Sequence, residues 1–312
     1  MQDSNQNSNS MTAPVQFDDA DELLDIRYDN IFKAVFTRDT PASKGALSGL
    51  ISSLIMRKVI VETIITNEPP AESIFDRSIR YDIACRAETG ELINIEMSFN
   101  PDFLEPVRLE YYISRHFSGQ NIKGIDKNYS DLKETYQIAI LGTRRFFLDE
   151  AIVHAFQYHD PVHDVSLKGK TRIVTMELKK AESIVEKPAF ELDSQEAWTV
   201  FFQYLTDKSK RVIINEILKR EAEIEMAGET LIHISQDEIE QARLTSELKY
   251  ILDNQSMLVT ARREGRAEGH AEGSAETRKA ERQRFIELLD QGLTVEQIKE
   301  YLAEGESPNR LP

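Results

Sequence analysis

Apolar and polar positions alternate most regularly in the stretch Arg80–Ser98. Two runs place an apolar residue at every second position: Ile79, Tyr81, Ile83 and Cys85, then Ile93, Ile95 and Met97. This period is typical of strands that bury one face. Between the runs, Glu88–Gly90 suits a three-residue hairpin loop, in which glycine supplies the left-handed residue. The pattern therefore predicts an antiparallel hairpin with Ala87 opposite Glu91.

The same pairing places one acid of each strand directly opposite the other, Asp82 facing Glu96, and it places Arg80 opposite Ser98. Facing positions bring Cβ atoms to about 5 Å, so two carboxylates there repel one another unless a cation lies between them. A hard divalent ion such as Mg²⁺ prefers oxygen ligands of this kind. We therefore predict Asp82 and Glu96 as metal ligands; solvated surface carboxylates are the alternative.

The remaining pattern predicts helices that begin near residues 27, 41, 106 and 194, and strands at 59–66, 136–141, 150–158 and 172–178. The first helix has a single apolar stripe of positions three and four apart: Tyr28, Ile31, Phe32, Val35 and Phe36. The order helix, strand, strand, strand, helix, strand predicts an α/β fold with a mixed sheet. Further helices are expected from residue 206 to the end of the chain.

The hairpin residues resemble those of a known family. Asp82-Ile83-Ala84, Gly90 and the phrase Ile-Asn-Ile-Glu-Met-Ser at 93–98 are similar to the PD-(D/E)XK nuclease superfamily, and within it to the recombination-promoting nuclease and putative transposase family. The resemblance implies a restriction-endonuclease-like αβββαβ core with an α-helical C-terminal region. It also implies a metal-dependent DNA endonuclease of recombination or transposition, which uses Mg²⁺ or another divalent cation.

The sequence departs from this pattern at Ser98, where the superfamily has Lys and this branch usually has Gln. In the superfamily that side chain orients the attacking water and balances developing negative charge, and a serine hydroxyl carries no charge. Lys33 or Arg80 would then have to supply it. The alternative is a catalytically impaired protein that acts as a DNA- or protein-binding module.

Two helices extend the resemblance, which covers roughly residues 27–205. Asp29 and Lys33 are four residues apart, and they form either a surface ion pair or the border of the metal site that the resemblance implies. Arg108, Tyr112 and Arg115 recur at helical spacing. Such a ridge either grips nucleic-acid phosphates with stacking support or is a solvated charged face.

Composition limits the function classes. The formal charge of −16 opposes sequence-independent DNA binding, but residues 26–205 hold only 26 of the 54 acids and 22 of the 38 bases. One cysteine excludes an internal disulfide and a cysteine-based zinc site, and suits a reducing cytosol. No apolar run approaches the roughly 20 residues of a membrane helix. We therefore expect a cytoplasmic protein.

The predicted domains are a disordered acidic leader (1–25), a nuclease-like domain (26–205) and a helical C-terminal region (206–312). Within the last region, residues 261–277 repeat glutamate and glycine every fourth position. Glycine weakens a helix by about 1 kcal/mol each, so the repeat is either a flexible charged linker or a helix along which a second copy could associate. A terminal helical hairpin follows the repeat.

Overall fold

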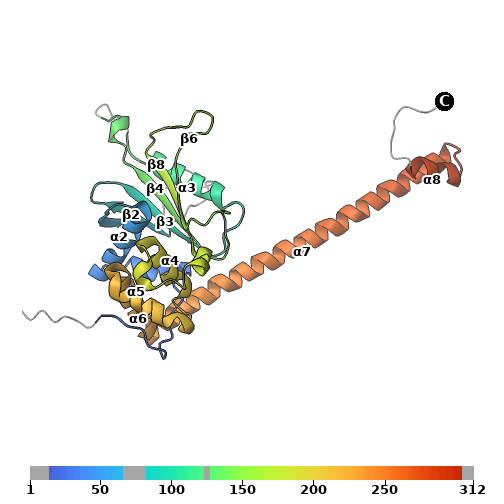
Figure 1. Ribbon diagram of the computed structural model, residues 1–312. Coiled ribbons are helices and arrows are strands. Elements are labelled where there is room, and N and C mark those ends of the chain that lie inside the picture. Colours follow the sequence, from blue (N-terminus) through green and yellow to red (C-terminus); the bar gives the residue numbers. More distant parts are fainter. Residues whose placement is uncertain (1–13, 66–81, 123–126, 304–312) are drawn as a thin grey trace, which may run out of the picture. The chain divides into compact units, whose positions relative to one another are not determined.

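The computed structural model describes residues 14–65, 82–122 and 127–303 (Figure 1). The chain divides into two compact units, Met1–Leu248 and Lys249–Pro312, and each is considered by itself. No helix among the described residues has the length and apolar character needed to cross a membrane.

The first unit is organised around a six-stranded mixed sheet in the order β1-β2-β3-β4-β8-β5. Strands β1, β2 and β3 are antiparallel, β3, β4 and β8 are parallel, and β5 is antiparallel to β8. The predicted α/β fold with a mixed sheet is thus confirmed. The strands are β1 (Val61–Ile65), β2 (Ile83–Ala87), β3 (Leu92–Ser98), β4 (Thr135–Leu141), β5 (Val153–Phe156) and β8 (Thr171–Glu177), and a separate ribbon pairs β6 (His159–Asp160) with β7 (Val165–Ser166).

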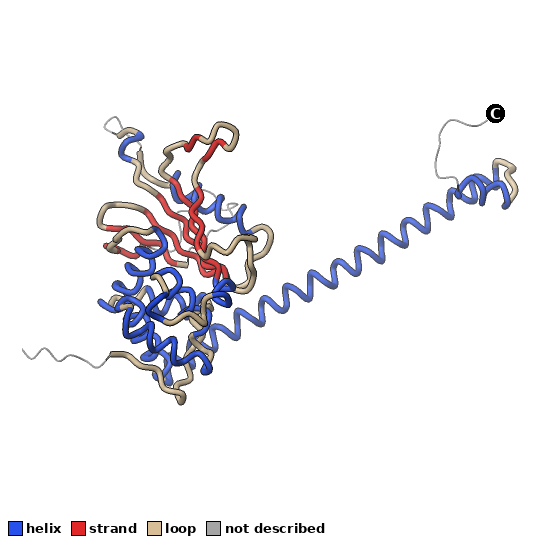
Figure 2. The backbone as a smooth tube through the Cα atoms, viewed as in Figure 1, coloured by secondary structure: helices blue, strands red, loops and turns tan. Residues whose placement is uncertain are grey.

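Helices cover the two faces of this sheet unequally (Figures 1 and 2). Helix α2 packs on β1 and β8, and α6 packs on α2, whereas α3 crosses β3, β4 and β8. The helices of the first unit are α1 (Asp29–Phe36), α2 (Pro41–Ile55), α3 (Glu105–Ser118), α4 (Ser194–Tyr204), α5 (Arg211–Arg220) and α6 (Ala222–Gln236). Short 3-10 turns are η1 (Tyr129–Asp131), η2 (Leu178–Ser183), η3 (Ala189–Glu191) and η4 (Lys208–Lys210).

Side chains alternate between the two faces of the strands, and the faces differ in chemistry. The predicted apolar positions of the hairpin belong to the main core: Ile83, Cys85, Ile93, Ile95 and Met97. The face under α3 instead carries buried polar residues next to small and apolar ones: Asn94, Glu96, Ser98 and Gln137. Polar groups thus lie on the face of the sheet against which α3 packs.

The described part of the N-terminal segment packs on the first unit. Disorder is predicted for residues 1–25, of which 1–13 lie outside the described residues, and Phe17 is fully buried in the main core. The backbone N–H of Phe17 donates to Asn215 Oδ1 at 2.9 Å, and Asn215 Nδ2 donates to the Phe17 carbonyl at 2.9 Å. The N–H groups of Val15 and Leu24 donate to Glu225 Oε1 at 2.9 Å and to Ser235 Oγ at 3.0 Å, so several contacts hold this segment on α5 and α6.

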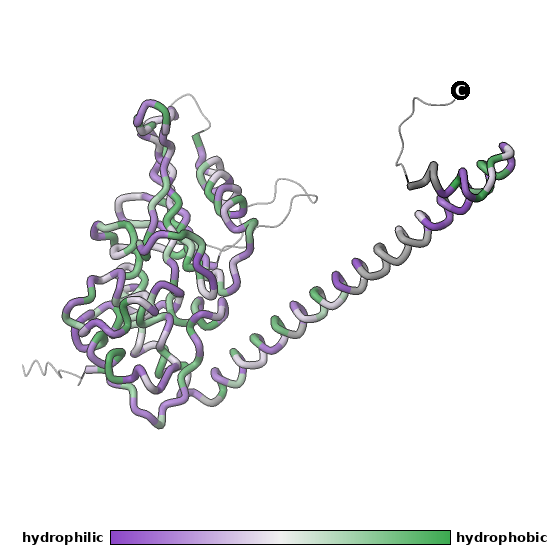
Figure 3. The backbone as a smooth tube through the Cα atoms, turned by 45° about the vertical axis from the view of Figure 1, so that its right-hand side comes forward, coloured by the Kyte–Doolittle hydropathy of each residue, from purple (hydrophilic) through white to green (hydrophobic). Residues whose placement is uncertain are grey.

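Helix α7 (Glu238–Asp290) begins in the first unit and continues into the second, where α8 (Val295–Ala303) follows. The glutamate-glycine repeat at 261–277 is helical rather than an irregular linker, because alanine, arginine and glutamate are strong helix formers that offset the glycines. Beyond residue 248, α7 exposes Tyr250, Met257 and Val259, and Figure 3 shows hydrophobic residues interspersed with hydrophilic ones along it.

Candidate active site

The hairpin has the register that its turn predicts. Gly90 adopts φ +94°, and the N–H of Ala87 donates to the Glu91 carbonyl at 3.0 Å. Ile83 pairs with Ile95, so one further step along the ladder brings Asp82 opposite Glu96.

Direct contacts join the two acids' residues. The N–H of Asp82 lies 3.4 Å from Glu96 Oε1, and the N–H of Met97 donates to Asp82 Oδ2 at 2.8 Å. Glu96 is 5% exposed, and the Asp82 side chain is 14% exposed. Each carboxyl group is therefore largely buried and lies against a backbone N–H of the other strand, at the open end of the hairpin.

The surroundings of these acids disfavour their ionised forms. Burial raises the pKa of Asp82 well above its ordinary value, and the charges of Glu96 and Asp29 raise it further. Burial also raises the pKa of Glu96 to about 7, against the opposing effects of a hydrogen bond from Asn94 and the charge of Arg108. A cation between the two groups would favour both carboxylates.

Helix α1 contributes a cation to the same place. Lys33 Nζ lies 3.4 Å from Asp82 Oδ1 and 2.8 Å from Asp29 Oδ1. Burial lowers the pKa of Lys33, but the charge of Asp82 and the bond to Asp29 outweigh this, and the pKa is raised overall. Asp29 and Lys33 thus form the ion pair that their spacing allows, and Lys33 also contacts Asp82; their place at the border of a metal site stays a prediction.

A buried amide pair, one member on β3 and the other on β4, supports Glu96. Asn94 Nδ2 donates to Glu96 Oε1 at 3.0 Å and to Gln137 Oε1 of β4 at 2.8 Å. The sequence analysis did not identify these two residues as part of the site. The pattern that could have found them is a polar residue at alternate positions of otherwise apolar strands, on the same parity as Glu96.

Ser98 is buried and belongs to a three-residue cluster with α3. Its hydroxyl donates to Glu105 Oε2 at 3.1 Å, and Arg108 Nη2 lies 3.3 Å from Ser98 Oγ and 2.7 Å from Glu105 Oε1. Glu105 is 4% exposed. Sequence reasoning missed Glu105, although its position three residues before Arg108 is that of a helical ion pair.

The predicted basic ridge of α3 is therefore divided. Arg108 turns toward Ser98, with its guanidinium carbon 5.9 Å from the centre of the Tyr112 ring. Tyr112 packs against Ala84 of β2, and Arg115 is partly exposed one turn further along. Arg80, the other predicted cation, lies outside the described residues.

The loop after β4 extends the same edge of the sheet. The N–H of Gly142 donates to the Ser98 carbonyl at 2.9 Å. Glu177, at the end of β8, accepts from the N–H groups of Phe146 and Phe147 and forms a fully buried ion pair with Lys180, 2.5 Å apart. Removing one partner of such a pair leaves a buried charge unpaired, so this pair fixes the loop beside the end of β3.

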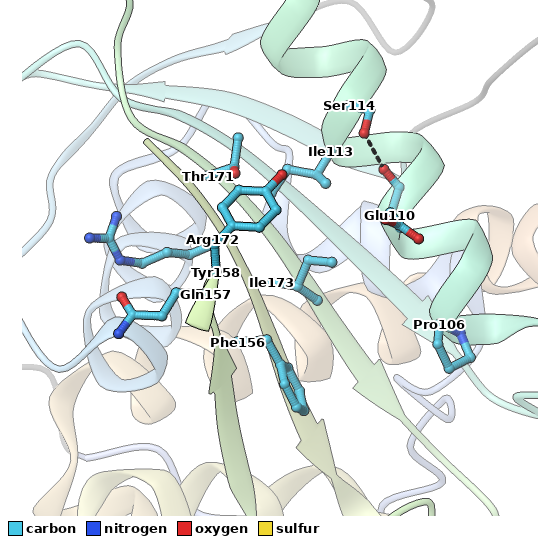
Figure 4. A pocket seen from close by; sticks show the side chains of 10 residues that line it. All are labelled: Pro106, Glu110, Ile113, Ser114, Phe156, Gln157, Tyr158, Thr171, Arg172 and Ile173. Carbon is cyan, nitrogen blue, oxygen red and sulfur yellow. Dashed lines mark hydrogen bonds between the residues drawn. The ribbon is translucent and has the colours of Figure 1, made fainter. Parts of the chain in front are cut away.

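A separate hollow of about 230 Å³ lies between α3 and strands β5 and β8. Figure 4 shows Phe156, Tyr158 and Ile173 in its walls, and the bond from Ser114 Oγ to the Glu110 carbonyl, 2.7 Å long, within α3. None of the predicted site residues is among its described lining residues. The acids are thus not in this hollow but at the edge of the sheet.

The donor set fits a hard divalent cation. In residues 14–65, 82–122 and 127–303, no three His, Cys, Asp or Glu side chains are grouped so that they could hold a metal ion. Mg²⁺, however, is commonly held by one or two carboxylates, with water and substrate phosphate as its other ligands. The two carboxyl groups, both with raised pKa, are of the kind that such an ion would stabilise.

Comparison with known proteins identifies a family. The family described as "PD-(D/E)XK nuclease family transposase" matches residues 26–261, more than half of the 312 residues. The matched range includes the hairpin, α1 and α3. No curated protein and no solved structure gives a significant match.

Proposed function

Because the chain belongs to the PD-(D/E)XK nuclease family of transposases, we propose that it is a metal-dependent DNA endonuclease of recombination or transposition. The observation that supports this most is the placement of Asp82 opposite Glu96 at the end of the hairpin, with the Asp82 N–H 3.4 Å from Glu96 Oε1. The fold holds two acids together in a buried place where each favours its protonated form. A structural role alone would not require this cost.

Asp82 and Glu96 would hold Mg²⁺ in this proposal. When bound, the ion acidifies a water molecule and stabilises negative charge on the scissile phosphate. Lys33 favours the ionised form of Asp82 and limits its movement through their 3.4 Å contact. Asn94 fixes one oxygen of Glu96, which leaves the other oxygen for the cation. Arg80 stays a candidate for a further charge at the site.

DNA is the proposed substrate, and the exposed side of α3 is the proposed contact for its backbone. Tyr112 offers a ring for stacking and Arg115 a charge for a phosphate. A cytoplasmic location fits such a substrate. Double-strand cleavage usually uses two active sites, and pairing of two copies through the C-terminal helices would supply them.

Ser98 favours a second candidate function. A catalytically impaired protein that binds DNA or partner chains would keep the fold and lose the charge that the superfamily's lysine provides. Its Ser98 hydroxyl donates to Glu105 and cannot balance charge on a phosphate.

A plasmid cleavage assay separates the two functions. Purified full-length protein is incubated with supercoiled plasmid and Mg²⁺, Mn²⁺ or Ca²⁺. We expect nicked and linear products with Mg²⁺ or Mn²⁺ and none with a chelator, because the acids alone cannot activate water. Gel electrophoresis gives the rate, and fluorescence anisotropy of a labelled duplex gives the affinity. Binding without cleavage at enzyme excess, with every cation, would support the binding module instead.

A further inference from the structure

The cluster formed by Ser98, Glu105 and Arg108 joins the start of α3 to the end of β3. Glu105 is almost completely buried at the start of α3, and burial of a carboxylate is costly unless it is paired. It accepts from Ser98 Oγ at 3.1 Å and from Arg108 Nη2 at 2.7 Å. A buried acid thus fixes a guanidinium next to a short side chain of β3.

The guanidinium occupies a particular place. Arg108 Nη2 lies 3.3 Å from Ser98 Oγ, the last atom of that side chain. A longer side chain at position 98 would therefore extend into the space that the guanidinium fills. Ser98 lies two residues after Glu96, so both side chains leave β3 on the same face.

Arg108 can also be reached from solvent. Its side chain is 42% exposed, so a phosphate could approach it. An arginine has five N–H donors, and the described contacts to Ser98 and Glu105 involve only Nη2.

Lys33 is less suited to the same role. Its ammonium contacts Asp29 at 2.8 Å and Asp82 at 3.4 Å, so two carboxylates already balance its single charge. The described direct contact of Arg108 with a carboxylate is with Glu105 alone, and its fork geometry matches two phosphate oxygens.

We infer that Arg108 is the cation of the active site: held by Glu105 against Ser98, it contacts the scissile phosphate and balances the charge that develops there. This inference rests on the proposed nuclease function. It means that the charge missing from position 98 comes from α3, and that Glu105 is a positioning residue. The serine is then small because it accommodates the guanidinium.

The test measures single-turnover plasmid cleavage with Mg²⁺ at saturating protein, together with DNA affinity in Ca²⁺. We expect Arg108→Ala to lower the cleavage rate by about 100-fold or more, the effect of removing one preorganised donor to a developing charge, with a much smaller change in affinity. Arg108→Lys keeps the positive charge but loses the forked guanidinium, so its cleavage rate should fall less than that of Arg108→Ala. The cleavage rate of Glu105→Gln should lie between the rates of these two variants.

Rescue distinguishes chemistry from folding. The double variant Arg108→Ala, Ser98→Lys places an ammonium in the vacated space. It should recover at least a tenth of the lost cleavage rate, which leaves its activation free energy no more than about 1.4 kcal/mol above that of the wild type. Arg243→Ala removes an exposed helical arginine of α7 that pairs with Glu247, and it serves as the matched control with wild-type cleavage. Thermal melting of each variant shows whether it is folded.

The outcomes distinguish a failure of this inference from a failure of the proposed nuclease function. If the wild type cleaves DNA and the cleavage rate of Arg108→Ala is within threefold of the wild-type rate, the inference is overturned and the proposed function is not. A folded Arg108→Ala that loses cleavage and affinity equally, with no rescue by Ser98→Lys, also overturns it, because Arg108 would then only bind DNA. Absence of cleavage by wild type overturns the proposed function, and the inference with it.

Discussion

An Asp82→Asn variant is expected to cleave supercoiled plasmid at least about a thousand times more slowly than the wild type. Asparagine keeps the size of the side chain and can still accept from the N–H of Met97, but it lacks the charge that holds a divalent ion. Loss of a bound cation removes several kcal/mol of transition-state stabilisation, and about 4 kcal/mol corresponds to a thousand-fold in rate. Initial rates of nicking with Mg²⁺ measure the effect.

Asp39→Asn is the matched control, because Asp39 is 93% exposed and pairs only with Lys44 among its described contacts. It should cleave at the wild-type rate. Wild-type activity of a folded Asp82→Asn protein would show that Asp82 is not a metal ligand. Loss of activity in both variants would point to a general effect of charge on DNA binding.

Glu96→Gln is expected to make the metal-free protein more stable at pH 8, although it removes a proposed metal ligand. Burial raises the pKa of Glu96 to about 7 from 4.5. The unfolded chain releases this proton near pH 4.5 and the folded protein near pH 7. Between these values the unfolded state binds fewer protons, so the free energy of unfolding falls as pH rises, and above pH 7 the loss is complete.

Glutamine does not ionise, so the variant avoids this loss, which is on the order of 3 kcal/mol at pH 8 and vanishes near pH 4. Urea unfolding in a chelator measures it through the fluorescence of Trp198, the single tryptophan, which is buried in the first unit. Glu216→Gln, at an exposed position of α5, should change little at either pH. Equal stability of wild type and Glu96→Gln at pH 8 would contradict the raised pKa.

Mg²⁺ should reverse the order of stability. Because a ligand that binds only the folded state raises its stability, millimolar Mg²⁺ should raise the unfolding midpoint of the wild type. It should leave Glu96→Gln nearly unchanged. The same shift in both proteins would show that Mg²⁺ binds elsewhere.

Local rules explain why the sequence was sufficient for the hairpin. The alternation of apolar residues chooses the buried face, and the loop that ends at Gly90 sets which residues pair. Together they place Asp82 opposite Glu96 without any knowledge of the rest of the fold. The apolar stripe of α1 likewise predicts which side of that helix is buried, and hence that Lys33 lies elsewhere on it.

The cluster around Arg108 could not be predicted in the same way. Helical spacing places Arg108 on one ridge with Tyr112 and Arg115, and it contains no information about what lies opposite that ridge. The contact with Ser98 depends on how α3 crosses β3, which long-range packing decides. The Asn94–Gln137 bond depends similarly on the parallel register of β3 and β4.

The most direct test of the central claim is a crystal of the full-length protein soaked in Mn²⁺ and measured at a wavelength where manganese scatters anomalously. We expect one anomalous peak within coordination distance of carboxylate oxygens of both Asp82 and Glu96. A peak held by only one of them, or two carboxyl groups that stay metal-free at millimolar Mn²⁺, would contradict the claim that these residues form a metal site.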